Sequence, residues 1–195
     1  MSNDGNKEIE IQVQIEKSTK LKAFLKKEAK FIGKKHQIDK YFSPAHKNYI
    51  KIRPVDEWLR LRDSSGAFSI NYKYWHHDLD HKSQYCDEYE TGIESLEQAE
   101  NIFKALDIKN VAIVDKTRKL YLYKKYEIAI DSIKGLGDFV EIEYKGKLGK
   151  LKPEDITEEM VKFLKSFNVG KISRNYVGYP FQILFPKEVE YEIIK

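Results

Sequence analysis

The stretch EIEIQVQI, at residues 8–15, alternates acidic or amide side chains with β-branched apolar ones. A period of two places successive side chains on opposite faces of a β-strand, and β-branched residues favour a strand over a helix. One face then carries the carboxylates of Glu8 and Glu10, about 7 Å apart along the strand. Alone, the stretch is typical of a half-buried strand with a hydrated acidic face. Several later strands, however, repeat the pattern with charges of both signs.

Length and composition exclude several classes of protein. With 195 residues the chain can bury the core of one domain. A net charge of +4 is too small to predict a nucleic-acid partner. Residues 1–7 are polar, and no apolar run approaches the ~18–20 residues that span a bilayer, so we expect no targeting segment and no membrane association. Cys86 has no partner for an intramolecular disulfide, which suits a reducing, cytoplasmic location.

Hydrophobic periodicity predicts eight strands and three helices. The strands are expected at residues 8–15, 36–42, 58–62, 67–75, 84–91, 111–123, 126–132 and 138–144. The first helix is expected from Ser18 or Thr19 to Phe31, ended by Gly33. The others are expected from the capping box at Ser95 to Leu106, and from Pro153 to Phe167. The tail, residues 170–195, reads as irregular, with a short helix or strand at 180–185.

The polar faces of these strands carry charges of both signs. The acids are Glu8, Glu10, Glu88, Glu90, Asp131, Glu141 and Glu143, and the bases are Arg60, Arg62, Lys73, Lys116 and Arg118. On the inside of a curved sheet such charges must pair or meet a ligand. Carboxylates suit Mg²⁺ or Mn²⁺, and Arg and Lys suit phosphate oxygens. Alternation does not say which face is concave, so hydrated outer faces with cross-strand salt bridges remain the other interpretation.

Several short motifs, taken in order, resemble the CYTH superfamily, and in particular its branch named for class IV adenylyl cyclases. They are Glu8-x-Glu10, QIDKYF at 37–42, LRLR at 59–62, Tyr72-Lys73, Glu88-Tyr89-Glu90, KTRKLY at 116–121, Asp131, and GLGDFVEIE at 135–143. The resemblance covers residues 8–145 and extends loosely to Arg174 and Tyr176. Each motif is weak alone, but their order and spacing together are specific.

The resemblance implies an α+β fold: a closed eight-stranded antiparallel β-barrel, called a triphosphate tunnel, flanked by helices. Residues 1–195 would form one domain, with a core at 8–145 and a C-terminal extension at 146–195. The implied metal ligands are Glu8, Glu10, Glu141 and Glu143. The implied triphosphate-binding residues are Gln12, Arg60, Arg62, Lys73, Lys116, Arg118 and Arg174. Asp131 is expected to serve a second metal or orient the first, and Lys73 to act as a general base if its pKa is lowered.

One residue departs from the family pattern. The family's opening motif is Glu-x-Glu-x-Lys, and this chain has Gln12 at the last position. Glutamine can donate a hydrogen bond but brings no charge. The change could weaken substrate binding, shift specificity, or mark a member that binds without turnover.

The resemblance leaves three functions open. A cyclase of the class IV type would convert ATP to cyclic AMP and pyrophosphate with Mg²⁺ or Mn²⁺. A tripolyphosphatase, or a thiamine or nucleoside triphosphatase, would hydrolyse the terminal phosphate of another triphosphate at the same site. A non-catalytic polyphosphate- or nucleotide-binding module would do neither. A homodimer is common for such domains.

Overall fold

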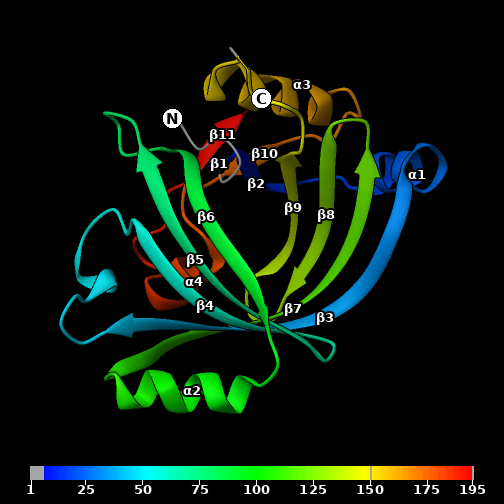
Figure 1. Cartoon of the computed structure of the whole chain (residues 1–195). Helices are drawn as coiled ribbons and strands as arrows, with labels where there is room; N and C mark the ends of the chain where they lie inside the picture. The colour runs from blue at the N-terminus through cyan, green and yellow to red at the C-terminus, as the bar shows by residue number, and fades with distance from the viewer. Residues whose placement is uncertain (1–6, 150, 195) are drawn as a thin grey trace.

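The computed structural model describes residues 7–149 and 151–194, so the polar start at 1–6 lies outside the described residues. Its main feature is one curled sheet of eleven strands in which every neighbouring pair is antiparallel (Figure 1). The strands are β1 (Lys7–Glu8), β2 (Glu10–Ile15), β3 (Lys30–Pro44), β4 (Glu57–Ser64), β5 (Ala67–His77), β6 (Ser83–Ile93), β7 (Ile108–Tyr123), β8 (Tyr126–Ile133), β9 (Gly137–Tyr144), β10 (Ile172–Arg174) and β11 (Glu192–Ile194). The α+β class is therefore as predicted.

The strand order is β1-β6-β5-β4-β3-β7-β8-β9-β2-β10-β11, which has two ends. The predicted closed barrel of eight strands is therefore not confirmed. The predicted first strand is divided at Ile9: β1 pairs with β6 near one end of the order, and β2 pairs with β9 and β10 near the other. One short stretch of chain thus joins two distant parts of the sheet.

The first helix is shorter than predicted. Helix α1 (Thr19–Glu28) ends before the apolar pair Phe31 and Ile32, which belong to β3. Phe31 pairs with Tyr121 of β7, and Gly33 lies at a shift in the β3–β7 register instead of ending the helix. Pairing with a distant strand has overridden the local helical pattern.

Helices α2 (Leu96–Ala105) and α3 (Pro153–Lys165) lie where the sequence pattern predicted helices, and the stretch at 180–185, expected as a short helix or strand, is helix α4 (Tyr179–Leu184). The N-cap of α2, Ser95, accepts a hydrogen bond from the Gln98 amide at 3.2 Å. A 3₁₀ helix, η2 (Tyr49–Lys51), follows β3. The tail is not irregular throughout, because it adds β10 and β11 to the sheet beside β2. In the described part of the chain, no helix has the length and apolar character needed to cross a membrane.

The main core lies between the sheet and helices α1 and α3. Ile9, Ile11 and Val13, the apolar face of the first strand, are almost fully buried there. Leu25 of α1 and Met160 of α3 belong to the same cluster. Since the apolar face packs against helices, the polar face of the same strand must point to the other side of the sheet. This settles which face of the first strand is available to a site.

Truncating a core isoleucine tests this arrangement. Ile142 of β9 is fully buried in the main cluster, whereas Ile113 of β7 is 50% exposed. We expect Ile142→Ala to lower the free energy of unfolding by ~2–5 kcal/mol, because it removes buried methyl groups and leaves a cavity. The matched Ile113→Ala should change it by about 0.5 kcal/mol. Urea denaturation measures both, and equal effects would contradict the assigned core.

Candidate active site

A cavity of ≈190 Å³, here called the charged cavity, opens on the polar side of the sheet. It brings together most of the residues that the sequence predicted: Glu8, Glu10, Gln12, Arg60, Arg62, Lys73, Lys116, Arg118, Glu141 and Glu143 all line it. They come from strands spread through the sheet, and helix α4 adds Tyr179 and Pro180. The interpretation that these charges splay into water is therefore wrong.

One wall of the charged cavity is cationic. Asp39 of β3, wholly buried, accepts two hydrogen bonds from Arg62 at 2.6 and 2.7 Å. The Lys116 ammonium lies 3.3 Å and the Arg60 guanidinium 3.9 Å from the same carboxylate. Burial raises the pKa of Asp39, but the three cations outweigh burial and hold that pKa far below its ordinary value. Three positive charges thus converge on Asp39, and Arg60 also lies 3.6 Å from Glu90. The two carboxylates leave the wall with an excess of positive charge.

A second group on this side centres on Arg118. Its guanidinium donates to both oxygens of Asp131, at 2.8 and 2.6 Å, and lies 2.8 Å from Glu141. Asp131 is wholly buried, does not line the cavity, and also accepts from the Tyr179 hydroxyl at 3.0 Å. With both oxygens engaged, Asp131 is placed to orient Arg118, and the geometry does not favour the catalytic or metal-serving role predicted for it.

The opposite wall is acidic, and Lys73 lies within it. The Lys73 ammonium is 2.5 Å from Glu8, 3.6 Å from Glu88 and 3.9 Å from Glu10. Burial lowers the pKa of Lys73, but the surrounding carboxylates outweigh it and raise that pKa well above the ordinary value. The condition set for Lys73 as a general base, a lowered pKa, is therefore not met here. Lys73 is an internal counterion of the acidic wall.

The acidic wall holds more carboxylates than its cations neutralise. Burial raises the pKa of Glu10 well above its ordinary value, and the charges of Glu8, Glu141 and Glu143 raise it further against the pull of Lys73. Burial, together with the charge of Glu8, raises the pKa of Glu143 to about 8, although Lys145 pairs with it. Carboxylates that resist ionisation for lack of a cation are suitable ligands for a hard divalent ion. Across residues 7–149 and 151–194, however, no three His, Cys, Asp or Glu side chains already stand in a metal-binding arrangement.

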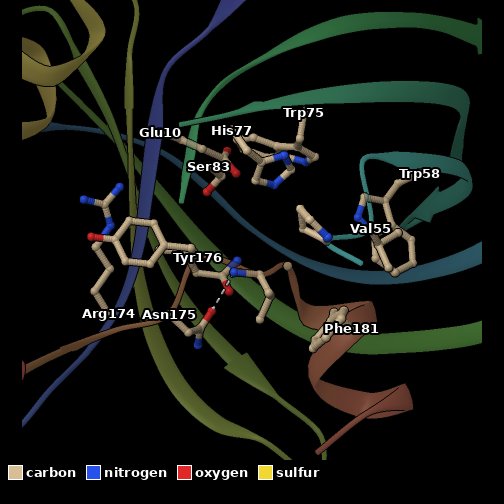
Figure 2. Close-up of a pocket in the computed structure, with 14 residues that line it drawn as sticks. Glu10, Val55, Trp58, Trp75, His77, Ser83, Arg174, Asn175, Tyr176 and Phe181 are labelled. Carbon is tan, nitrogen blue, oxygen red and sulfur yellow. Dashed lines mark hydrogen bonds between the residues drawn. The ribbon is translucent and has the colours of Figure 1, made fainter. Parts of the chain in front are cut away.

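A second pocket, here called the aromatic pocket, is drawn in Figure 2. It shares part of its lining with the charged cavity: Glu10, Gln12, Trp58, Trp75 and Gly178. Its apolar lining is Val55, Trp58, Trp75, Val177 and Phe181. Arg174, predicted as a phosphate ligand, lines this pocket and not the charged cavity. Its buried guanidinium lies 4.3 Å from the centre of the Tyr176 ring, and no described carboxylate lies within 4.0 Å of it. Burial lowers the pKa of Arg174, which is consistent with a cation short of a counterion.

Asp39, Glu88 and Tyr179 are among the residues of the site to which the sequence analysis gave no such role. Asp39 was visible as a polar residue alternating with Ile38 and Lys40, but a single carboxylate did not indicate a counterion for three cations. Glu88 was recognised as an acid on its strand without a role, and it accepts a hydrogen bond from Asn71 at 2.6 Å. Tyr179 lies in a tail with no periodic pattern, so no signal placed it in the site.

The fold and site together define a class: an α+β protein whose curled antiparallel sheet holds opposed cationic and acidic walls. The CYTH domain profile matches residues 6–176, and the chain belongs to the CYTH domain family. The resemblance expected from the sequence is thereby confirmed.

Individual relatives agree with this assignment. A Methanocaldococcus jannaschii protein named "Putative adenylate cyclase MJ0240" is 37% identical over 166 residues, which cover 84% of this chain and 91% of that protein. The solved structure of the PH1819 protein from Pyrococcus horikoshii OT3 is 26% identical, with a TM-score of 0.73 and coverage of 92% of this chain and 99% of that one. The solved structure of "Putative adenylyl cyclase HpAC1" from Hippeastrum, a protein described as having a dominant triphosphatase activity, is 16% identical with a TM-score of 0.62. The match covers 92% of this chain and 95% of that one, and it shows the fold alone.

Removing the shared counterion tests the cationic wall. We expect Asp39→Asn to lower the free energy of unfolding by ~3–5 kcal/mol, because Arg62 and Lys116 then lie buried without their partner. Added inorganic tripolyphosphate should restore more stability to this variant than to the unchanged protein, since a polyanion can replace the lost charge. Thermal denaturation with and without the anion measures both effects.

The control is Asp115→Asn, which removes a carboxylate whose side chain is 37% exposed and which pairs with His36. It should change stability by no more than about 1 kcal/mol. If Asp39→Asn were as stable as this control, Asp39 would not be the counterion that holds the wall together.

Proposed function

We propose that the protein is a metal-dependent enzyme that acts on a triphosphate in the charged cavity, as a class IV adenylyl cyclase does. The observation that carries this proposal is one cavity with a cationic wall short of anions facing an acidic wall short of cations. A phosphate chain bound together with divalent cations supplies both deficits at once. The proposed phosphate ligands are Arg60, Arg62, Lys116 and Arg118, with Lys73 and Gln12 nearby and Arg174 at the aromatic pocket.

Arg60 supports an anion at the cationic wall. Its Nε is buried without a hydrogen-bond partner, and its nearest carboxylates, Glu90 and Asp39, lie at 3.6 and 3.9 Å. Arg62, by contrast, is held in a two-point contact by Asp39. A guanidinium that keeps unused donors beside a cavity is suited to phosphate oxygens, which accept in the same planar geometry.

Glu8, Glu10, Glu141 and Glu143 would hold Mg²⁺ or Mn²⁺. Their hard oxygen donors and their shortage of positive charge fit such an ion. When bound, the ion would supply neutralising charge for the phosphate chain and for the leaving group. Lys73 lies among these carboxylates, so its ammonium must shift toward Glu88 or the phosphate when the ion enters.

The proposed chemistry is in-line displacement at phosphorus. In the cyclase reaction the ribose 3′-hydroxyl attacks the α-phosphorus and pyrophosphate leaves. Arg118, held by Asp131, and Lys116 would orient the phosphate chain and stabilise the charge that develops on it. The 37% identical relative, whose name is "Putative adenylate cyclase MJ0240", supports the choice of the cyclase reaction for this proposal.

We also propose that the sheet functions as a closed tunnel. Residues 7–15 pair with β6 through β1 and with β9 through β2, and the Tyr144 amide donates to the Ile9 carbonyl at 2.9 Å, where the first strand divides. The first strand would then be the strand that closes the barrel. It also carries Glu8 and Glu10, two of the proposed metal ligands.

Product analysis tests the function. The protein is incubated with ATP, thiamine triphosphate or inorganic tripolyphosphate, each with Mg²⁺ or Mn²⁺. Cyclic AMP and pyrophosphate from ATP are the expected products. Inorganic phosphate would instead assign a triphosphatase, and tight binding without products would assign a binding module. If none of the three compounds bound or reacted, the proposal would be wrong.

Neutralising the first strand tests the metal ligands. We expect Glu8→Gln with Glu10→Gln to lower turnover at least ~100-fold, because the site loses two of its anionic oxygen ligands while side-chain shape is kept. Circular dichroism should show an unchanged fold. Glu158→Gln, on an exposed face of α3, is the matched control and should retain full activity. Full activity in the double variant would remove the metal assignment.

The pH dependence of anion binding tests Lys116. Burial and the nearby Arg118 lower its pKa to about 8, against the pull of Asp39. Lys116 is thus charged below pH 8 and neutral above it, so anion affinity is greatest below pH 8 and falls as pH rises. Between pH 8 and 9 we expect the Kd for metal-free tripolyphosphate to rise about 5-fold, as one proton linked to binding requires.

Lys116→Arg provides the comparison, because arginine stays charged throughout this range. Glu143 has a pKa of about 8 as well, so its ionisation contributes to the dependence in both proteins. Calorimetric titration from pH 7 to 9.5 should therefore give a shallower slope in the variant. Equal slopes would show that Lys116 is not the titrating ligand.

A further inference from the structure

We propose that Gln182 of α4 is a positioning residue, which holds Gln12 as a neutral hydrogen-bond donor where the charged cavity meets the aromatic pocket. We further propose that this junction receives the esterified phosphate of an organic triphosphate, and thereby selects against inorganic tripolyphosphate. The inference rests on the proposed function and names its substrate class.

The orientation of the amides follows from two backbone groups of Val177. Its N–H donates to Oδ1 of Asn175 at 3.3 Å (Figure 2). Its carbonyl and the same Asn175 Oδ1 both lie 3.5 Å from Nε2 of Gln182. Since a backbone N–H only donates and a carbonyl only accepts, Asn175 must present its oxygen and Gln182 its nitrogen.

Gln182 then determines how Gln12 is turned. Nε2 of Gln182 donates to Oε1 of Gln12 at 3.0 Å, the shortest contact in this amide network. The oxygen of Gln12 is therefore engaged, and its NH₂ group faces away from Gln182. Among residues 7–149 and 151–194, no acceptor receives a hydrogen bond from that NH₂ group. Gln12 lines both the charged cavity and the aromatic pocket, so its free donor lies at their junction.

The amide network of Gln182 and Asn175 is buried, and one of its donors is left without a hydrogen bond. Gln182 and Asn175 are 2% and 3% exposed, so neither amide can turn freely in water. Nδ2 of Asn175 is buried without a partner, which is unfavourable by itself. Nδ2 of Asn175 stays unpaired because Oδ1 of Asn175 accepts from the Val177 amide. In this orientation Gln182 donates to Gln12.

The charge at the junction matches one end of an organic triphosphate. A terminal phosphate carries a charge of about −1.5 to −2 at neutral pH, whereas a phosphate that also bears an ester carries one charge fewer. Arg174 supplies one positive charge beside the junction, and Gln12 supplies none. A lysine at position 12, as the family motif has, would add a second positive charge and favour a doubly charged phosphate.

The surroundings of the junction also suit an organic group. The aromatic pocket is lined by Val55 and Phe181, together with Trp58 and Trp75, which it shares with the charged cavity. These offer apolar and aromatic surface to a planar or hydrophobic substituent, and nothing to a bare phosphate. The hydrogen bond to Gln12 comes from Gln182 in helix α4. Helix α4 lies beyond residue 176, where the match to the family profile ends.

The test compares substrates across variants. For the unchanged protein, kcat/KM and Kd are measured with ATP, thiamine triphosphate and tripolyphosphate, and the ratio of organic to inorganic substrate is expected to exceed one. Gln12→Lys should shift that ratio toward tripolyphosphate by at least ~10-fold, because a charged donor replaces a neutral one. Gln14→Lys is the matched control: Gln14 lies one repeat along the same strand face, lines neither cavity, and should leave the ratio unchanged.

A second variant separates positioning from structural support. In Gln182→Glu the carboxylate can only accept, so Gln12 must turn its NH₂ group toward it and its oxygen toward the substrate. We expect KM for the organic triphosphate to rise ~10-fold with a smaller change in kcat. The melting temperature should fall, because the buried carboxylate faces the Val177 carbonyl and Asn175 Oδ1, so the kinetic comparison is made at a temperature where the variant is folded. A purely structural role would instead lower activity on all substrates alike.

Two kinds of result distinguish a failure of this inference from a failure of the proposed function. An unchanged substrate ratio in Gln12→Lys, or a preference of the unchanged protein for tripolyphosphate, would overturn this inference and leave the proposed function intact. Failure of the unchanged protein to bind or convert any of the three compounds would overturn the proposed function, and this inference with it.

Discussion

Asp39 is wholly buried beneath Arg62, Lys116 and Arg60, and this shared counterion is the interaction on which the site depends. Three cations could not be held together inside a curled sheet without it, because their repulsion and their loss of hydration would both oppose folding. One carboxylate is enough to keep them in place and too little to neutralise them. The cationic wall is therefore ordered before any ligand arrives, and it still attracts anions.

The acidic wall has the same arrangement with the signs of charge reversed. Lys73 lies among Glu8, Glu10 and Glu88, as Asp39 lies among its cations, and it leaves an excess of the opposite charge. Each wall thus carries an internal partner that stabilises the empty protein and that a ligand can outcompete. Apart from the shift of Lys73, the side chains are already placed, so little further reorganisation is required on binding. The same design explains how so many ionisable groups are tolerated beside one cavity.

Much of this could be predicted from local pattern. Alternation placed the polar faces of the strands, and because β-strands have a strict period of two, it also brought ten predicted site residues into one cavity. The failures have a common cause. Phe31 continues a helical pattern but pairs with Tyr121 of β7, and residues 172–174 pair with β2, which lies more than 150 residues earlier in the chain. Likewise, the pKa of Lys73 is raised by carboxylates from other strands, and Asp131 binds Arg118 of the neighbouring strand. A short stretch of sequence around either residue does not contain these partners.

The division of the first strand has a consequence for how the protein is made. Its residues are made before their partners, which lie in β6, β9 and β10. Until β9 has been synthesised, Glu8 and Glu10 cannot meet Glu141. Contacts so distant in sequence form late and slowly. A nascent chain of this protein therefore cannot complete the charged cavity before β9 has been made.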